Sequence, residues 1–311
     1  MAARININFI ASEIIFFNIF GVFGNLNFIY LTTTRKKLQS KSSILQCCLS
    51  VCHVVCLLFE LPNSYLLFSG NQLHRNVCYP AISIYIFFIC SQAVLILMIT
   101  IDIVVIVYFP SFYQTASTFK YIISMCIPPV IYSSIILVWG FLTMDDEVIP
   151  FCNPPLSMTL TVRRIWTFSN VLINSMVLLL FVFLIVVFYR RGKSQKSDTR
   201  KIMKRLKTML MIFIFTWYIA LLAADLFVVL GVNGEALNFM TSNLVFFVLI
   251  CYSQSFYTVL WRSSEYRSAF FDAWSVIPCV AEVREKHFRS SKVGVTSTYN
   301  PSAVHASNGG N

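Results

Sequence analysis

The chain has 311 residues, of which 57% are hydrophobic and only 12% are charged. A typical soluble domain carries about 25% charged residues, so this composition argues against a soluble protein and is typical of one that lies in a membrane. The formal net charge of +11 does not indicate nucleic-acid binding, because most of the basic residues flank apolar stretches.

Seven apolar stretches follow one another along the chain, each long enough to cross a bilayer. A helix needs about 20 apolar residues to span about 30 Å of hydrocarbon. Only helices or closed barrels pair every backbone N–H and C=O in lipid, and these evenly apolar stretches lack the alternation of barrel strands. The sequence therefore predicts an all-α membrane protein, a seven-transmembrane helix bundle. Its spans are predicted at residues 9–31, 43–68, 78–109, 120–141, 165–189, 206–231 and 237–261.

The predicted bundle covers residues 9–261, and the segments outside it are short. Residues 1–8 are expected to form an extracellular N-terminus. Residues 275–311 are more polar, and we expect them to be a mostly disordered cytoplasmic tail.

Residues 262–274, between the seventh span and the tail, have the apolar spacing of a short amphipathic helix on the membrane surface. Tyr266, Phe270 and Phe271 recur at helical intervals, and Arg262 and Arg267 suit an anionic leaflet. The alternative is an unstructured tail beside the membrane.

The distribution of Lys and Arg predicts the orientation of the bundle. All but four of the 24 basic residues lie in the loops and the tail that share one side, with a dense group at residues 190–207. The opposite side holds the acidic run at residues 145–147. Because cytoplasmic loops carry an excess of Lys and Arg, we expect a plasma-membrane protein with its N-terminus outside and its C-terminus inside.

The cysteines divide by their depth in the predicted membrane. Cys78 and Cys152 are both predicted to face the oxidising outside, so a disulfide between them is expected, the alternative being two unpaired thiols. Cys279 in the tail is a palmitoylation candidate. The cysteines within spans are expected to be small packing residues; they are Cys47, Cys48, Cys52, Cys56, Cys90, Cys126 and Cys251.

Several residues at fixed offsets resemble those of the rhodopsin-like G-protein-coupled receptors. The pair Gly24-Asn25 lies late in the first span, and Asp102 lies 24 residues after Cys78, followed eight residues later by Pro110. The resemblance makes Asn25 a core residue of the bundle. It places Asp102, Ile103 and Pro110 at the contact with a G protein.

A second part of this resemblance lies in the sixth and seventh spans. Phe213 and Trp217, spaced i, i+4, are similar to the packing pair that reports activation in these receptors. Ser255 falls near the end of helix seven. The resemblance makes these residues part of the switch, together with Asn25, His53 and Gln92.

A closer resemblance is to the nematode serpentine chemoreceptors of the srsx type. Three stretches carry it: RKKLQSKSSILQCCLS from Arg35, FCNPP around Cys152, and WRSSEYRSAF from Trp261. The resemblance covers nearly the whole seven-helix region. It implies a chemosensory receptor in sensory neurons that couples to a heterotrimeric G protein.

The chain also departs from the receptor pattern. Ile103 stands where the family has the Arg that reaches into the opened G-protein cavity, and its side chain cannot donate a hydrogen bond. Ser255, Phe256 and Val259 replace the usual Asn-Pro-x-x-Tyr, and Ile219 replaces the helix-six Pro. These differences weaken the expectation of ordinary G-protein switching, but not of the fold.

His53 stands where the family has an Asp in the middle of helix two. The resemblance places Gln92 opposite it, at the point where these receptors hold a sodium ion against the carboxylate. An ionisable residue deep in a span is a functional candidate. One interpretation is a satisfied polar pair between helices; the other is a proton-sensitive switch, since histidine titrates near neutral pH.

The resemblance also implies where a ligand would bind, between the outer halves of helices three, five, six and seven. The pocket would be largely apolar and would lack the Asp that amine receptors carry on helix three, so we expect a small, weakly polar or apolar ligand. Glu13, Glu60 and Asp225 are acidic residues in or near the spans that could contact a ligand or lie near the outer interface, and we expect the interfacial position for Glu13. The implied pocket residues are Tyr85, Ile86, Ile89, Trp217, Ala220, Leu221 and Val245.

Three classes of function remain open. The first is a ligand-activated receptor that signals through a G protein. The second, favoured by Ile103, is a non-signalling seven-helix protein that acts as a decoy or trafficking partner. The third is a transporter or channel, but the chain shows no internal repeat and only one Pro pair, Pro128-Pro129, well inside a span. No catalytic or phosphate-binding motif and no metal-ligand spacing is present, so we expect no enzyme activity, cofactor or metal.

Overall fold

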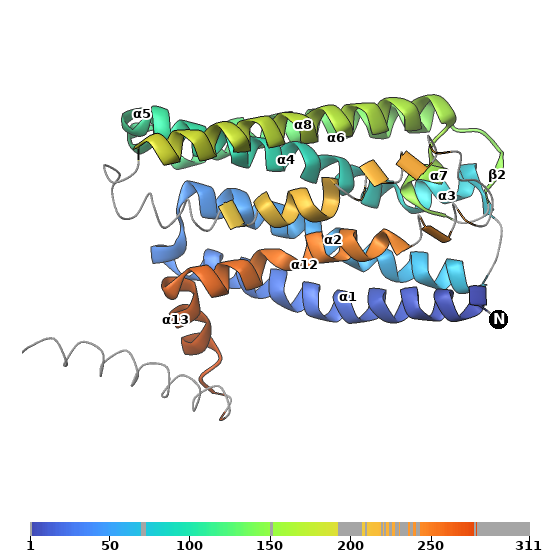
Figure 1. The fold of residues 1–311 in the computed structure, drawn as a ribbon, viewed down its shortest axis with the longest axis horizontal. Coiled ribbons are helices and arrows are strands. Elements are labelled where there is room, and N and C mark those ends of the chain that lie inside the picture. The colour runs from blue at the N-terminus through green and yellow to red at the C-terminus, as the bar shows by residue number, and fades with distance from the viewer. Residues whose placement is uncertain are drawn as a thin grey trace, which may run out of the picture. The chain divides into compact units, whose positions relative to one another are not determined.

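The computed structural model of the chain describes residues 2–69, 73–149, 152–191, 207–208, 210–218, 220, 222–223, 226–227, 230, 236, 239–240, 243–276 and 278. Almost all of the described chain is helical, and the long helices of residues 1–263 run side by side (Figure 1). The long helices are α1 (Ala2–Thr34), α2 (Lys41–Ser69), α4 (Ser83–Tyr108), α6 (Thr118–Leu142), α8 (Leu160–Arg191) and α12 (Val245–Arg262). Shorter elements are η1 (Lys36–Leu38), β1 (Leu73–His74), α3 (Arg75–Ala81), α5 (Pro110–Thr115), β2 (Val148–Ile149), α7 (Pro154–Ser157), the π-helical turn η3 (Ile214–Tyr218) and α13 (Ser264–Ala273).

All six long helices are long and apolar enough to cross a membrane. They correspond to six of the seven predicted spans and confirm an all-α architecture of membrane-spanning helices. The remaining predicted span, residues 206–231, is only partly described, and η3 lies within it.

Three predicted boundaries differ from the structure. The span predicted at 78–109 is interrupted at Ile82, two residues after Pro80, so that α3 and α4 replace one continuous helix. The break lies inside a continuous apolar run, so hydropathy does not detect it. The helices α1 and α8 begin at Ala2 and Leu160, before the predicted residues 9 and 165. Hydropathy did not detect these first turns because they contain polar residues.

The helix α4 lies at the centre of the bundle. It packs against α2, α6 and α8, and 78% of its membrane-spanning window is buried, against 22% for α6. A helix that is apolar on all sides and buried is the core of the assembly, whereas α6 presents most of its surface to lipid.

The helices α1 and α12 pack closely because glycines on α1 allow it. A Cβ atom at Gly24 would lie 2.8 Å from a ring carbon of Tyr257, and one at Gly21 would collide with the Ser253 side chain. Close approach through small residues is a common way for helices to associate in membranes. Gly24 is part of the Gly-Asn pair noted in the sequence, and its neighbour Asn25 is fully buried.

The helix α13 belongs to a second compact unit, residues 264–311. It lies within the range predicted for an amphipathic helix, with Glu265 in the first turn, where the helix dipole favours a negative charge. Tyr266 is buried, and the rings of Phe270 and Phe271 are 5.9 Å apart. Its position on a membrane surface remains a prediction.

Candidate functional site

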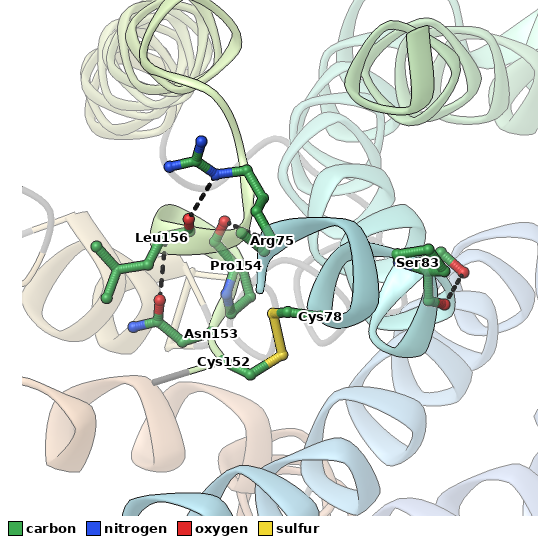
Figure 2. The surroundings of a disulfide bond; sticks show 9 residues. Arg75, Cys78, Ser83, Cys152, Asn153, Pro154 and Leu156 are labelled. Carbon is green, nitrogen blue, oxygen red and sulfur yellow. Dashed lines mark hydrogen bonds between the residues drawn. A yellow bond between two sulfur atoms is a disulfide. The ribbon is translucent and has the colours of Figure 1, made fainter. Parts of the chain in front are cut away.

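One end of the bundle is closed by a disulfide between Cys78 in α3 and Cys152 just before α7. The sulfur atoms are 2.07 Å apart and the two Cα atoms 5.6 Å apart. Figure 2 shows the bond joining α3 to the segment that enters α7, where Asn153 accepts a hydrogen bond from the Leu156 amide at 3.0 Å. The pairing expected for these two cysteines is present in the structure. We call this end of the bundle the disulfide end.

Arg75 holds the loop that follows α6 against the same end. Its largely buried guanidinium pairs with Asp145 and, at 2.9 Å, with Glu147. Its Nε donates to the carbonyl of Leu156 at 3.3 Å, as Figure 2 shows. The antiparallel pair β1–β2 joins the same two segments through backbone hydrogen bonds. A covalent bond, a strand pair and a multidentate arginine therefore fix this loop over α3.

The residues implied for a ligand pocket lie mostly in the interior of the bundle. Tyr85, Ile86 and Ile89 of α4 are buried, as are Trp217 and Ala220, and Val245 at the start of α12 is half-buried. Leu221 lies outside the described residues. The binding of a ligand by these residues remains a prediction.

The tryptophan of the sixth span lies in a wide helical turn. Trp217 belongs to the π-helix η3, and its ring centre is 5.9 Å from that of Tyr252 on α12. Phe213, the residue expected to pack with it, is also buried. Single π-helical turns inside helices occur frequently at functional sites. The turn therefore distinguishes this part of the sixth span, although the usual proline is absent from the chain.

Tyr252 is the centre of a buried polar cluster in the middle of the bundle. The Asn25 side chain donates to the Tyr252 carbonyl at 2.8 Å, and Gln92 donates to the Tyr252 hydroxyl at 3.4 Å. The ring of His53 is 5.5 Å from that of Tyr252, and its Nδ1 is 3.5 Å from the Ser255 hydroxyl. The cluster thus joins α1, α2, α4 and α12.

This cluster corrects the expectation that His53 and Gln92 form a pair. Gln92 contacts Tyr252, and the hydrogen-bond partner of His53 is Ser255 on α12. The sequence offered no reason to include Tyr252, because a tyrosine in an apolar span is usually a packing residue. Its central position follows from the rotation of α12, which periodicity alone does not determine.

A hollow of about 20 Å³ lies beside this cluster, large enough for about one water molecule. Its lining residues come from α2, α4, α12 and the sixth span: Leu49, His53, Ile96, Ile99, Leu210, Phe213, Cys251 and Gln254. Within the described part of the chain, His53 Nε2 and Gln92 Oε1 are buried and have no hydrogen-bond partner. The described middle of the bundle therefore contains unpaired polar atoms beside a small hollow.

A larger hollow, of about 280 Å³, lies away from the implied pocket. It is bordered by residues of α1, α12 and the sixth span, among them Phe17, Phe20, Ile212, Tyr257 and Trp261. Trp261 is exposed, and the rings of Phe20 and Tyr257 stack at 3.8 Å. An apolar groove of this kind suits the hydrocarbon chains of surrounding lipid.

The end of α4 opposite the disulfide contains Asp102, which is completely buried. Its carboxylate accepts hydrogen bonds from Ser42 on α2 and from the Tyr121 hydroxyl on α6, the latter at 2.7 Å. We call this region the Asp102 end. Two hydroxyl donors from two helices satisfy a buried carboxylate and tie α2, α4 and α6 together.

Lys41, the neighbour of Ser42 on α2, connects the Asp102 end to the short helix α5. Its ammonium donates to the carbonyls of Tyr113 and Ala116, the latter at 2.7 Å, and lies 4.8 Å from the Tyr113 ring centre and 5.3 Å from that of Tyr121. A cation at the C-terminus of a helix satisfies its last carbonyls and interacts favourably with its dipole. This role of Lys41 was not predicted, because in the sequence it is one of several basic residues that flank the second span.

Ile103 and Pro110, the other two residues expected at the G-protein contact, differ in their exposure. Ile103 is only 3% exposed and belongs to the hydrophobic core, whereas Pro110 is the exposed first residue of α5. The position of the missing arginine is therefore filled by an apolar packing residue. Cys279 lies outside the described residues.

The described residues contain no group of three or more His, Cys, Asp or Glu side chains that could hold a metal. A comparison with protein families matches residues 18–274 to the family described as "Serpentine type 7TM GPCR chemoreceptor Srsx". This match covers every described membrane-spanning helix in whole or in part. No curated protein matches the chain.

Proposed function

Because the chain belongs to the Srsx family of serpentine seven-transmembrane chemoreceptors, we propose that it is a chemosensory receptor that signals to a heterotrimeric G protein. It lies in the plasma membrane with the disulfide end outside and the Asp102 end in the cytoplasm. This orientation rests on the excess of Lys and Arg in the loops and tail of one side.

The observation that carries this proposal is the buried cluster around Tyr252. It connects four helices through polar contacts and touches Trp217 on the sixth span, next to the implied ligand pocket. Polar groups buried in a bundle must exchange partners when the helices shift, so such a cluster favours discrete arrangements. A ligand that contacts Trp217 or α4 would bias the equilibrium between them.

The ligand would be a small molecule that binds between the disulfide-end halves of the helices. Tyr85, Ile86, Ile89, Trp217 and Val245 would contact it, with Ala220 and Leu221. These side chains give the pocket a largely apolar wall, which suits a ligand with a mostly apolar body.

The contact with the G protein would be centred on α5 and its surroundings. Phe112 on α5 is 58% exposed, and Lys41 fixes the far end of this helix. Asp102 joins the neighbouring helices α2, α4 and α6 through its hydrogen bonds. In this arrangement α5 is positioned for a partner although Ile103 provides no hydrogen-bond donor.

The second candidate function is a non-signalling seven-helix protein, either a decoy receptor or a trafficking partner. The burial of Ile103 in the core is the observation that favours it, because no donor from that position can reach a G protein.

G-protein activation, measured in cells that express either the full chain or an Ile103→Arg variant, distinguishes the two functions. We expect the unmodified chain to activate a G protein, either basally or on addition of mixed odorants. Silence of the unmodified chain, together with activity of the variant at equal surface expression, would support the decoy function instead.

A further inference from the structure

Glu60 is a buried carboxyl group in the disulfide-end half of α2. Its residue is 7% exposed, and it accepts a hydrogen bond from the hydroxyl of Tyr85, which is 2% exposed and lies on α4. The Asn63 side chain also lies close enough to the carboxyl group to interact with it. The structure thus places the carboxyl group of Glu60 in contact with Tyr85, one of the implied pocket residues.

Glu60 lacks a cationic partner among the described residues. The described ion pairs involve only His74 of β1 and Arg75 of α3 as cations, and both pair with acidic residues of the loop after α6. An acidic residue inside a membrane-spanning helix is costly, and it usually pairs with another charge or serves a function. Tyr85 supplies a neutral donor only.

The atoms around Glu60 favour a ligand that donates hydrogen bonds. The Asn63 Oδ1 atom is buried and has no partner among the described residues. A carboxylate has about four acceptor sites, so the site offers more acceptors than donors. The rings of Phe59 and Tyr85 stack beside it with centres 6.0 Å apart, and aromatic faces attract cations.

We propose that Glu60, with Asn63 and the Phe59–Tyr85 ring pair, binds the amino group of a ligand. The ligand class is a small primary amine with an apolar body, whose ammonium pairs with the carboxylate while the body contacts Ile86 and Ile89. This proposal rests on the proposed receptor function and refines its ligand. The expectation of a ligand without an amine followed from the absence of an acid on helix three, and the acid comes from α2.

A charge-assisted hydrogen bond from an ammonium is stronger than a neutral bond from a tyrosine hydroxyl. The ligand therefore replaces Tyr85 as the donor to Glu60 and frees the tyrosine hydroxyl. The contact between α2 and α4 then changes, which links ligand binding to the helices that carry the Tyr252 cluster.

Binding of simple amines tests the site without any G protein. The full chain, reconstituted in lipid nanodiscs, is titrated with primary alkylamines of three to eight carbons, and with the alcohols of the same carbon skeleton. The rise in the midpoint of thermal unfolding reports binding. We expect at least one amine to stabilise the protein at a concentration where its alcohol has no effect.

The variant Glu60→Gln keeps the size of the side chain and removes the charge. It should weaken amine binding about tenfold or more, because the ammonium loses its counter-ion. Glu265→Gln on α13 makes the same change at an exposed position outside the implied pocket; it is the matched control and should bind as the unmodified chain does. Tyr85→Phe should retain amine binding, because the ligand takes the place of its hydroxyl.

Two results would overturn the proposal: equal stabilisation by amines and alcohols, including none by either, or unchanged amine binding by Glu60→Gln. If Glu60→Gln does not fold, amine binding that Tyr85→Phe retains supports the site, and amine binding that Tyr85→Phe abolishes overturns it. Amine binding by a chain that activates no G protein would refute the proposed coupling and leave the site intact. G-protein activation evoked only by neutral ligands would support the proposed coupling and refute the amine site.

Discussion

The two ends of the bundle are held together by different means. At the disulfide end, a covalent bond and the Arg75 ion pairs fix the loop after α6 against α3. At the Asp102 end, neutral hydroxyls from Ser42 and Tyr121 satisfy the acid, and Lys41 fixes α5. The covalent bond at the disulfide end cannot change partners, whereas the hydrogen bonds at the Asp102 end can do so when helices move. The difference suits a molecule that binds a ligand at a fixed end and responds at a movable one.

Among the changes at the two ends, loss of the disulfide should lower the stability of the folded protein most. Cys78→Ser should lower the stability of the folded protein by about 4 kcal/mol in the chain-entropy account, because the bond closes a loop between residues 74 positions apart. The measurement is surface expression together with thermal unfolding in nanodiscs. Cys47→Ser, at a free cysteine, is the control and should behave as the unmodified chain does. Equal stability of Cys78→Ser and the unmodified chain would show that the bond does not fix this end.

Removal of the Arg75 charge should have the next largest effect at the same end. Arg75→Met should destabilise the protein by about 1–3 kcal/mol, because Asp145 and Glu147 lose their partner and the Leu156 carbonyl loses a donor. The midpoint of thermal unfolding measures the loss, and Arg164→Met at an exposed position is the control. An equal loss of stability in Arg75→Met and Arg164→Met would show that the Arg75 contacts do not stabilise the disulfide end.

The Asp102 end should respond in activity more than in stability. Tyr121→Phe removes one of the two hydroxyl donors to Asp102 and should cost about 1–2 kcal/mol. It should also raise basal G-protein activation, because the link between α4 and α6 is weaker. Tyr132→Phe, which breaks a contact with Ser169 on α8, is the control. Unchanged basal activity in Tyr121→Phe would mean that Asp102 has no part in the resting state.

The smallest effect is expected in the middle of the bundle. Ser255→Ala removes a contact of 3.5 Å to His53, which is long for a hydrogen bond, so the loss of stability should be about 0.5 kcal/mol or less. Thermal unfolding beside the exposed control Ser12→Ala measures it. A loss several times larger would show that the histidine depends on Ser255 for its position.

The sequence predicted the fold well because membrane-spanning helices are encoded by long, uniform hydropathy. Six of the spans and the pairing of Cys78 with Cys152 are present in the structure. The break at Ile82 was missed because it lies inside a continuous apolar run, where hydropathy is uniform. The family was identified from ordered motifs, and the family match agrees with it.

The candidate site was less predictable than the fold. The contacts of Glu60 with Tyr85, and of Lys41 with α5, join residues distant in the sequence. Such contacts depend on how each helix is rotated and on how far its side chains reach. Tyr252 was missed for the same reason, since hydropathy places it in a span but does not tell which neighbour it faces.

The most direct test of the account is nucleotide exchange on purified heterotrimeric G protein by the full chain in nanodiscs. We expect the chain, with Ile103 in place, to accelerate exchange, and a stabilising ligand to change that rate. No acceleration by the unmodified chain in the presence of a ligand shown to bind it, together with acceleration by Ile103→Arg, would contradict the account and identify a receptor that binds without signalling.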